Sequence, residues 1–310
     1  MPKSIAFIIN PAAGFGKTKK RIKTIIKHIK SVAPDAKIVQ THHPLHAISL
    51  TKQLIEEGYL RLVVVGGDGT LNEVVNGYFN QDGSPCNKMV SIAMVPSGSG
   101  SDFFRSLHQE HKLHEIIKMA VTREALPTDV GLVHAHDAHG HMVKRYFINV
   151  SSVGLSGLVA GFMKTVNRSL GPTMAYFMAT LQAIRALKPA TIMMTSLGFE
   201  KTIEKCSLLS FANGQYFGSG MKIAPHAKLD DGLFDVVGIK NLGPLFFIMH
   251  GWRIYQGRHL ELDNTEVHRL KDCVVKTSNK EPVYVETDGE LFAELPATYS
   301  LCHKAILIVR

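Results

Sequence analysis

The sequence has few of the features that mark disulfide-rich, zinc-binding or membrane-spanning proteins. Its four cysteines are far apart and form no paired motif, which argues against a disulfide framework or a zinc site. No apolar run is long enough to cross a bilayer. The chain starts with a strand pattern in place of the layout of a signal peptide, so we expect a cytoplasmic protein.

Aromatic residues and acidic charge are also sparse. There is a single tryptophan, and no basic motif has interleaved aromatic residues, so we expect no nucleic-acid partner. The 35 lysines and arginines outnumber the 26 aspartates and glutamates, which gives a formal net charge of +9. This charge suits an anionic partner such as a nucleotide or an acidic membrane surface, without choosing between them.

The 310 residues, of which 45% are hydrophobic, suffice for two domains with cores of their own. Up to about residue 125, strand patterns alternate with amphipathic helices, which is typical of a doubly wound parallel sheet. Beyond Pro127, many strand patterns and few helical ones predict an antiparallel sandwich or barrel. We therefore place an α/β domain at residues 1–125 and a second domain at residues 126–310. Residues 297–310 could return to the first domain.

One stretch organises the first domain. Residues 62–65 form an apolar strand pattern that stops at Gly66-Gly67-Asp68-Gly69, and helical spacing begins near Thr70. Glycines let the backbone approach a phosphate, and the first N–H groups of a helix point at the anion. Asp68 would repel phosphate, but it could hold a metal ion or a hydroxyl group beside it. A tight turn with an ordinary capping residue explains the same residues equally well.

Two more loops with glycines follow strand patterns. In residues 10–18, Gly16-Lys17-Thr18 looks like the end of a P-loop, but Pro11 stands where the P-loop needs glycine. Residues 96–103 contain two glycines that do not complete a dinucleotide fingerprint. Ligands bind at the edge where parallel strands end, so we expect the loops at 66–69 and 98–100 to share that edge.

Three polar stretches of the second domain are typical of turns and loops. Residues 134–141 contain four histidines around a turn, and we expect a polar hairpin tip in preference to a metal site. Asp288-Gly289 is a pair favoured in type I′ hairpin turns. Asp230-Asp231-Gly232 indicates a loop. From the residues alone, none of these stretches requires a function.

Several blocks of the sequence nevertheless resemble the diacylglycerol kinase catalytic-domain family of lipid kinases, especially its soluble bacterial type. The blocks are Asn10-Pro11 with Gly14, residues 66–77, 96–103, 213–220 and 224–236, and Asp288-Gly289-Glu290. The resemblance covers nearly the whole chain. Ser99, Ser101 and Ser219 depart from the residues usual in the family.

This resemblance implies a first domain like that of phosphofructokinases and NAD kinases, followed by a β-sandwich. The reaction that it implies is transfer of the γ-phosphate of Mg-ATP to a lipid hydroxyl group, with diacylglycerol as the first choice of acceptor. The protein would then visit a membrane surface reversibly, and a homodimer is possible.

The resemblance also implies roles for individual residues. The nucleotide would be bound by Asn10, Gly14, Gly66, Gly67, Gly69, Thr70 and Ser99. Asp288 would act as general base, Glu290 would orient it or help to hold metal, and Asp68 would lie by Mg²⁺ or the reacting hydroxyl. We expect Glu290, two residues along a strand, to share a face with Asp288. By the same resemblance, Asp231 and the carbonyl groups of Lys228 and Leu233 would bind a structural Mg²⁺.

A lipid substrate needs an apolar path, for which residues 162–163, 174–178 and 245–249 are candidates, although core packing explains them as well. Three alternatives stay open. They are a kinase for another hydroxyl lipid such as phosphatidylglycerol or a sphingoid base, a kinase for a soluble acceptor, and a non-catalytic lipid-binding regulator. The presence of Asp68, Asp288 and Glu290 argues against the last.

Overall fold

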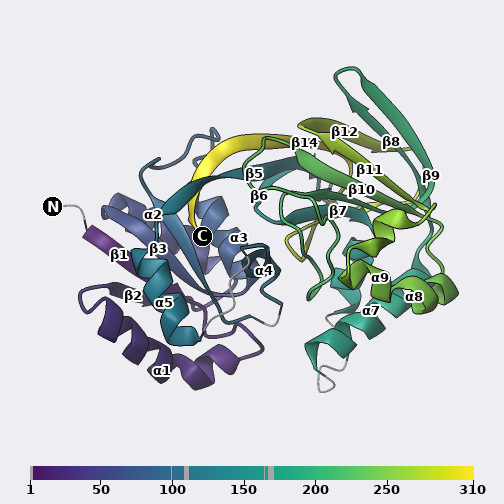
Figure 1. Cartoon of the computed structure of the whole chain (residues 1–310). Helices are drawn as coiled ribbons and strands as arrows, with labels where there is room; N and C mark the ends of the chain where they lie inside the picture. Colours follow the sequence, from purple (N-terminus) through teal and green to yellow (C-terminus); the bar gives the residue numbers. More distant parts are fainter. Residues whose placement is uncertain (1–2, 99, 108–111, 164, 167–170) are drawn as a thin grey trace. The chain divides into compact units, whose positions relative to one another are not determined.

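The structure is a computed structural model that describes residues 3–98, 100–107, 112–163, 165, 166 and 171–310. The chain divides into two compact units (Figure 1). Unit 1 comprises Met1–Asp129 and His303–Arg310, and unit 2 comprises Val130–Cys302. The strands β5 (Ala125–His136) and β14 (Glu290–Val309) contain residues of both units.

Unit 1 is built on a parallel sheet with the strand order β4-β3-β1-β2. Its strands are β1 (Lys3–Ile9), β2 (Lys37–Gln40), β3 (Tyr59–Gly66) and β4 (Ser91–Pro96). Its helices are α1 (Lys17–Val32), α2 (His46–Glu56), α3 (Asp68–Tyr78), α4 (Asp102–Ser106) and α5 (Leu113–Thr122). Residues 62–65 of β3 are fully buried, as expected for a strand covered on both faces.

The end of β14 completes the sheet of unit 1. Leu307 and Ile308 pair in parallel with Ser91 and Ile92 of β4. The last residues of the chain therefore return to unit 1, which the sequence had left open.

Unit 2 is mainly antiparallel. One run of its strands has the order β11-β10-β9-β7-β13-β14, and β12 pairs with both β14 and β8. The further strands are β6 (Met142–Phe147), β7 (Val150–Gly154), β8 (Ala190–Ser196), β9 (Phe199–Ala212), β10 (Phe234–Lys240), β11 (Thr265–Leu270), β12 (Asp272–Thr277) and β13 (Tyr284–Thr287). The helices are α6 (Leu155–Phe162), α7 (Pro172–Ala186), α8 (Pro244–His250), α9 (Trp252–Tyr255) and the 3-10 helix η2 (Arg258–Glu261).

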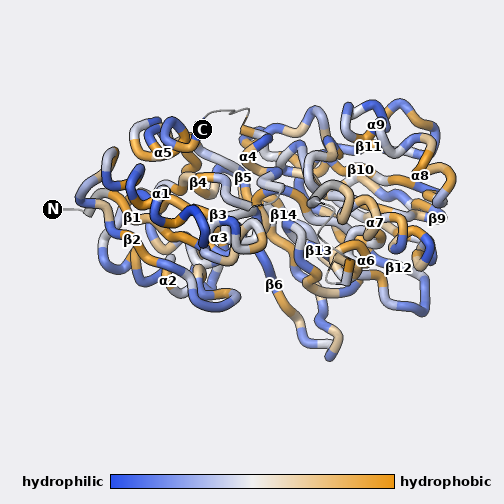
Figure 2. The backbone as a smooth tube through the Cα atoms, turned by 90° about the horizontal axis from the view of Figure 1, so that it is seen from below, coloured by the Kyte–Doolittle hydropathy of each residue, from blue (hydrophilic) through white to orange (hydrophobic). Residues whose placement is uncertain are grey.

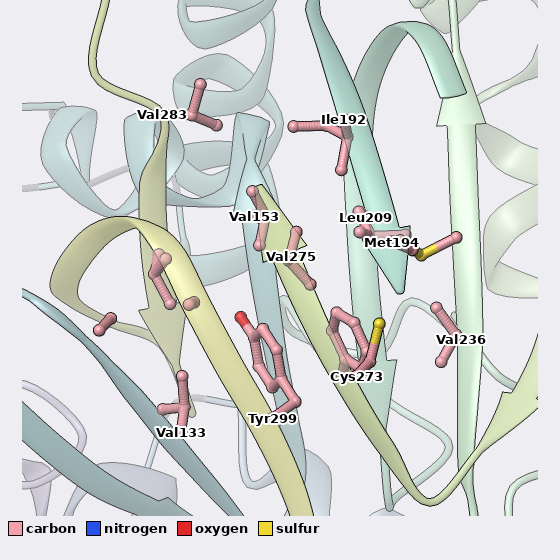
Figure 3. Packing of buried hydrophobic residues seen from close by; sticks show 14 of the residues in the cluster. Val133, Val153, Ile192, Met194, Leu209, Val236, Cys273, Val275, Val283 and Tyr299 are labelled. Atoms are coloured by element: carbon pink, nitrogen blue, oxygen red, sulfur yellow. The ribbon is translucent and has the colours of Figure 1, made fainter. Parts of the chain in front are cut away.

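The core of unit 2 lies between strands that are distant in sequence. Val153, Leu209, Val275 and Tyr299 come from four different strands and extend into the same space (Figure 3). The ring of Tyr299 stacks on that of Phe211 with 3.8 Å between their centroids. A second buried cluster lies under α6 and α7. An α/β domain followed by an antiparallel sandwich, as expected from the sequence, is confirmed.

Helices α8 and α9 are separated by a single residue, Gly251. A Cβ atom on Gly251 would lie 2.4 Å from the carbonyl oxygen of Phe247, so only glycine allows this close approach.

Candidate active site

Three loops meet at the edge of the unit 1 sheet where β1, β3 and β4 end. Strands β3 and β4 pair up to Gly66 and Pro96, and the N–H group of Asn10 donates to the carbonyl oxygen of Val65 at 2.9 Å. A Cβ atom added to Gly98 would lie 2.6 Å from Cα of Gly67. The predicted shared edge is therefore confirmed, because the two glycine loops touch through their backbones.

Side chains of the first loop tie it to the other two. Asn10 Nδ2 donates to Thr70 Oγ1 at 2.9 Å. The buried hydroxyl group of Thr18 lies 2.5 Å from Ser97 Oγ, and a Cβ atom on Gly14 would lie 2.6 Å from the carbonyl oxygen of Ser97. These contacts bring Asn10, Gly14, Gly66, Gly67 and Thr70 together, with Gly69 in the first turn of α3. Ser99 lies outside the described residues.

The arrangement fits an anionic ligand. Helix α3 begins at Asp68, directly after the glycine pair, and the N-terminus of a helix carries a partial positive charge. At Gly67 and Gly98 the space that side chains would fill is taken by neighbouring backbone, which brings main-chain groups of two loops to one place. These residues can hold the phosphates of a nucleotide.

Asp68 has a structural role within this edge. Its Oδ2 accepts the N–H group of Asp102 at 3.0 Å and its Oδ1 accepts that of Phe103 at 3.1 Å. Burial raises the pKa of the Asp68 carboxyl group, and these N–H groups act in the opposite direction. Asp68 thus links the loop at residues 66–69 to the start of α4. Its contact with Mg²⁺ or a hydroxyl group stays a prediction.

In unit 2, Asp288 and Gly289 form the turn between β13 and β14, with φ angles of 47° and 93°. The carboxylate of Asp288 accepts three main-chain N–H groups, from Ile148, Asn149 and Val150, at 3.0–3.1 Å. The side chain is 9% exposed. Asp288 is therefore both a turn residue and the candidate general base. The turn places its carboxylate against the connection between β6 and β7.

Glu290 is on the other side of this turn. It begins β14, whereas β13 ends before Asp288, so the expectation that both side chains share one face of a strand is wrong. Its Oε2 pairs with Arg145 Nη1 at 3.0 Å. Three main-chain N–H groups of residues 148–150 orient the Asp288 carboxylate.

Glu286 is a residue that sequence reasoning missed. It is buried on β13, and its Oε1 accepts the N–H group of Gly289 in the turn. Burial raises its pKa to about 8, and the charge of Asp288 also raises it, whereas the hydroxyl groups of Ser152 and Ser156 lower it. The alternation of acids at 286, 288 and 290 was the available signal. Burial therefore favours the protonated form of Glu286.

At the expected structural metal site, the guanidinium group of Arg269 pairs with Asp231. Asp231 Oδ2 pairs with Nη2 of Arg269, and its Oδ1 accepts the N–H group of Leu233 at 3.2 Å. Arg269 Nε also lies 3.8 Å from Asp235, whose pKa is raised by burial and lowered by Arg269. Since Arg269 already balances Asp231, these residues do not require Mg²⁺, and the ligand role of Asp231, Lys228 and Leu233 stays a prediction.

The histidine tract forms the end of the β5–β6 hairpin. Asp137 Oδ1 accepts the N–H groups of His139 and His141, each at 2.9 Å. Within the described part of the chain, no three His, Cys, Asp or Glu side chains are grouped as metal ligands would be.

An apolar cavity of about 60 Å³ lies in unit 2 among α6, α7, α8 and α9. Its lining includes Leu155, Val159, Tyr176, Phe246 and Phe247, together with the buried His259. Tyr176, Phe246 and Phe247 belong to the stretches expected to line a lipid path. Phe162 and Met163 instead pack against the second core cluster.

Comparison with known proteins agrees with this geometry. The model of the diacylglycerol kinase catalytic domain matches residues 4–133, and that of the YegS C-terminal NAD kinase beta sandwich-like domain matches residues 149–310. The chain is 29% identical over 308 residues to "Putative lipid kinase YtlR" of Bacillus subtilis (strain 168), covering 94% of each chain. It is 25% identical over 303 residues to a diacylglycerol kinase of Staphylococcus carnosus (strain TM300), covering 96% of this chain and 92% of the relative.

Solved structures share the fold. A diacylglycerol kinase from Bacillus anthracis str. Sterne is 21% identical, with a TM-score of 0.71 over 99% of this chain and 96% of that one. Yeast NADH kinase is 13% identical, with a TM-score of 0.54 over 99% of this chain and 83% of that one. The two matched domain models, which span residues 4–133 and 149–310, show that this chain belongs to the diacylglycerol kinase catalytic-domain family.

Proposed function

We propose that this protein transfers the γ-phosphate of ATP, bound with Mg²⁺, to the hydroxyl group of a lipid, with diacylglycerol as the first acceptor. The observation that carries the proposal is the meeting of three glycine-containing loops within the segment that matches the kinase domain. Kinase relatives along nearly the whole chain support a phosphotransferase. The choice of diacylglycerol rests on the names of relatives at 25% and 26% identity.

Unit 1 supplies the nucleotide end of the reaction. Phosphoryl transfer depends on positioning and on neutralising charge more than on covalent chemistry. Main-chain N–H groups at Gly66, Gly67 and Gly69 and the hydroxyl group of Thr70, which Asn10 positions, would hold phosphate oxygens. Mg²⁺, when bound, would neutralise negative charge on the phosphates, and Asp68 is the carboxylate that we expect beside it.

Unit 2 supplies the acceptor end. Asp288 would take the proton of the lipid hydroxyl group as the bond to phosphorus forms. Three main-chain N–H groups hold its carboxylate in one orientation, which a general base needs. The raised pKa of the neighbouring Glu286 favours its neutral form, which adds less negative charge beside Asp288 than a carboxylate would. The apolar cavity among α6–α9, at about 60 Å³, has room for only a small part of a hydrocarbon chain, since ligand pockets usually measure about 300–1,000 Å³.

The test is transfer of labelled phosphate from ATP to a panel of lipids in mixed micelles with Mg²⁺. The panel contains diacylglycerol, phosphatidylglycerol and a sphingoid base. The Asp288→Asn variant is compared with Asp137→Asn, a matched control in which a hairpin aspartate also accepts main-chain N–H groups. We expect a labelled lipid with the native protein and the control, and none with Asp288→Asn.

Two outcomes would overturn the proposal. If ATP binds but no lipid is labelled while a soluble acceptor is, the protein is a kinase of another class of acceptor. If ATP does not bind, the non-catalytic alternative is favoured.

A further inference from the structure

Three helices of unit 2 expose large apolar side chains beside one another. The group consists of Phe177 and Met178 of α7, Leu245, Ile248 and Met249 of α8, and Trp252 of α9, and we call it the α7–α9 surface. Leu245 is 71% exposed and Trp252 is 50% exposed. Helix α8 packs on both α7 and α9, so these side chains belong to one patch, and the backbone is coloured as hydrophobic along much of α7 and α8 (Figure 2).

Helix α8 is unusual in its burial. Five of the seven residues in its sequence PLFFIMH are large and apolar, yet the helix contains no buried residue. Helix α9, with the sequence WRIY, contains none either. A contiguous apolar patch of this kind on a water-exposed helix pair indicates that it contacts another apolar phase.

The three helices of this patch have charged side chains of one sign only, and the nearest acidic residue along the chain is Glu261 on η2. The sequences of α7, α8 and α9 contain no aspartate or glutamate, and they contribute Arg185, His250 and Arg253. The sequence also has no acidic residue between Asp137 and Glu200. The guanidinium group of Arg253 lies over the ring of Trp252, 5.7 Å from its centroid. An apolar face with tryptophan and arginine, and without acidic residues, complements the interface of an anionic bilayer.

The patch is continuous with the apolar cavity. Phe247 lines the cavity and stacks on the exposed Phe177, with 5.4 Å between the ring centroids. Leu245, Ile248 and Met249 are on the same short helix as Phe246 and Phe247. A lipid phase in contact with the surface would therefore adjoin the apolar lining of the cavity.

We propose that the α7–α9 surface is the part of this protein that enters the interface of an anionic lipid bilayer. Trp252 and the side chains of α8 would lie among the upper acyl chains, and Arg253 and Arg185 would meet anionic headgroups. This docking surface rests on the proposed function in one respect, because a lipid acceptor is the reason for the protein to bind a membrane.

The test measures flotation of the full chain with vesicles, without ATP. One set of vesicles is phosphatidylcholine alone, and the other contains phosphatidylglycerol as well. The test variant is Ile248→Asp with Trp252→Asp, two exposed positions where the change removes no core contact. The control is Leu197→Asp, a fully exposed apolar residue in the turn between β8 and β9.

We expect the native protein and Leu197→Asp to float with the anionic vesicles, and the double variant to partition at least about tenfold more weakly. Native protein that stays with the aqueous phase, or a double variant that floats equally well, would refute the proposal. Light scattering measures the oligomeric state of both proteins. If the native protein is a dimer, the double variant is a monomer and neither binds vesicles, the surface belongs to contact with a second copy of the chain.

The assay also separates this proposal from the proposed function. Asp288→Asn is expected to float like the native protein, because its side chain is in a turn outside the three helices. Flotation without lipid phosphorylation would leave the docking surface standing and overturn the kinase assignment. Phosphorylation of vesicle lipid at an equal rate by the native protein and the double variant would support the kinase assignment and overturn the docking surface.

Discussion

The two units place their candidate functional groups by opposite means. In unit 1 the absence of side chains matters, because Gly67 and Gly98 bring two loops into backbone contact. In unit 2 the presence of carboxyl groups matters, because Asp288 and Glu286 are both anchored at the β13–β14 turn. Enlarging a side chain should therefore damage the first unit, and changing the charge or protonation of a side chain should damage the second.

The largest effect is expected from Asp288→Asn. We expect turnover to fall by about 10²–10⁴-fold, the usual contribution of a general base, while ATP binding stays close to that of the native protein. Steady-state kinetics and nucleotide titration measure the two quantities. A fall in ATP affinity that accounts for the whole loss of rate would contradict a role confined to the acceptor end.

Glu286→Gln should change how stability depends on pH. The pKa of Glu286 is raised to about 8 in the folded protein, above its ordinary value of 4.5 in the unfolded chain, so between these values the folded state binds a proton that the unfolded state has released. This contribution to stability is present at low pH and is lost as pH rises from about 4.5 to about 8. We expect glutamine, which stays neutral, to flatten this decline in urea unfolding curves.

The comparison for this prediction is the difference in unfolding free energy between native protein and variant at pH 5 and pH 8. Relative to the native protein, the variant should have a larger unfolding free energy at pH 8 than at pH 5. An equal difference at both values would show that Glu286 titrates near its ordinary range and that burial does not control it.

Gly98→Ala tests unit 1. The new Cβ atom would lie 2.6 Å from Cα of Gly67, and neither backbone segment can yield easily, so we expect a loss of about 1–3 kcal/mol in stability and weaker ATP binding. Gly161→Ala on α6 is the matched control, since a Cβ atom there meets nothing within 4 Å. Chemical unfolding and nucleotide titration are the measurements. Equal effects of the two changes would refute the backbone contact.

Asp231→Asn is expected to have the smallest effect. The partner of Asp231, Arg269, has a side chain that is 48% exposed, so the ion pair contributes no more than about 1 kcal/mol. If Arg269 alone balances the charge of Asp231, a chelator leaves the melting temperature of the native protein unchanged. A melting temperature that a chelator lowers in the native protein, but not in Asp231→Asn, would instead support the structural Mg²⁺.

Much of the fold follows from local patterns. The order of strands and helices, the change of texture after Pro127 and the common edge of the glycine loops were all predicted from periodicity and turn residues. Side-chain partners were not. Asp68 contacts the start of α4, which is 34 residues away in sequence, and Asp288 contacts a connection about 140 residues earlier. Patterns in a single sequence contain no information on such pairs.

By itself, the sequence determined the two fold classes and the turn at Asp288-Gly289, because hydrophobic period and glycine placement are local properties. Its resemblance to known blocks indicated the kinase family. Only the tertiary structure decided what each carboxyl group contacts. It buried Glu286 and raised its pKa, paired Asp231 with Arg269, and placed Glu290 across a turn from Asp288. It also left the apolar side chains of α8 exposed, since burial depends on which distant elements cover a helix.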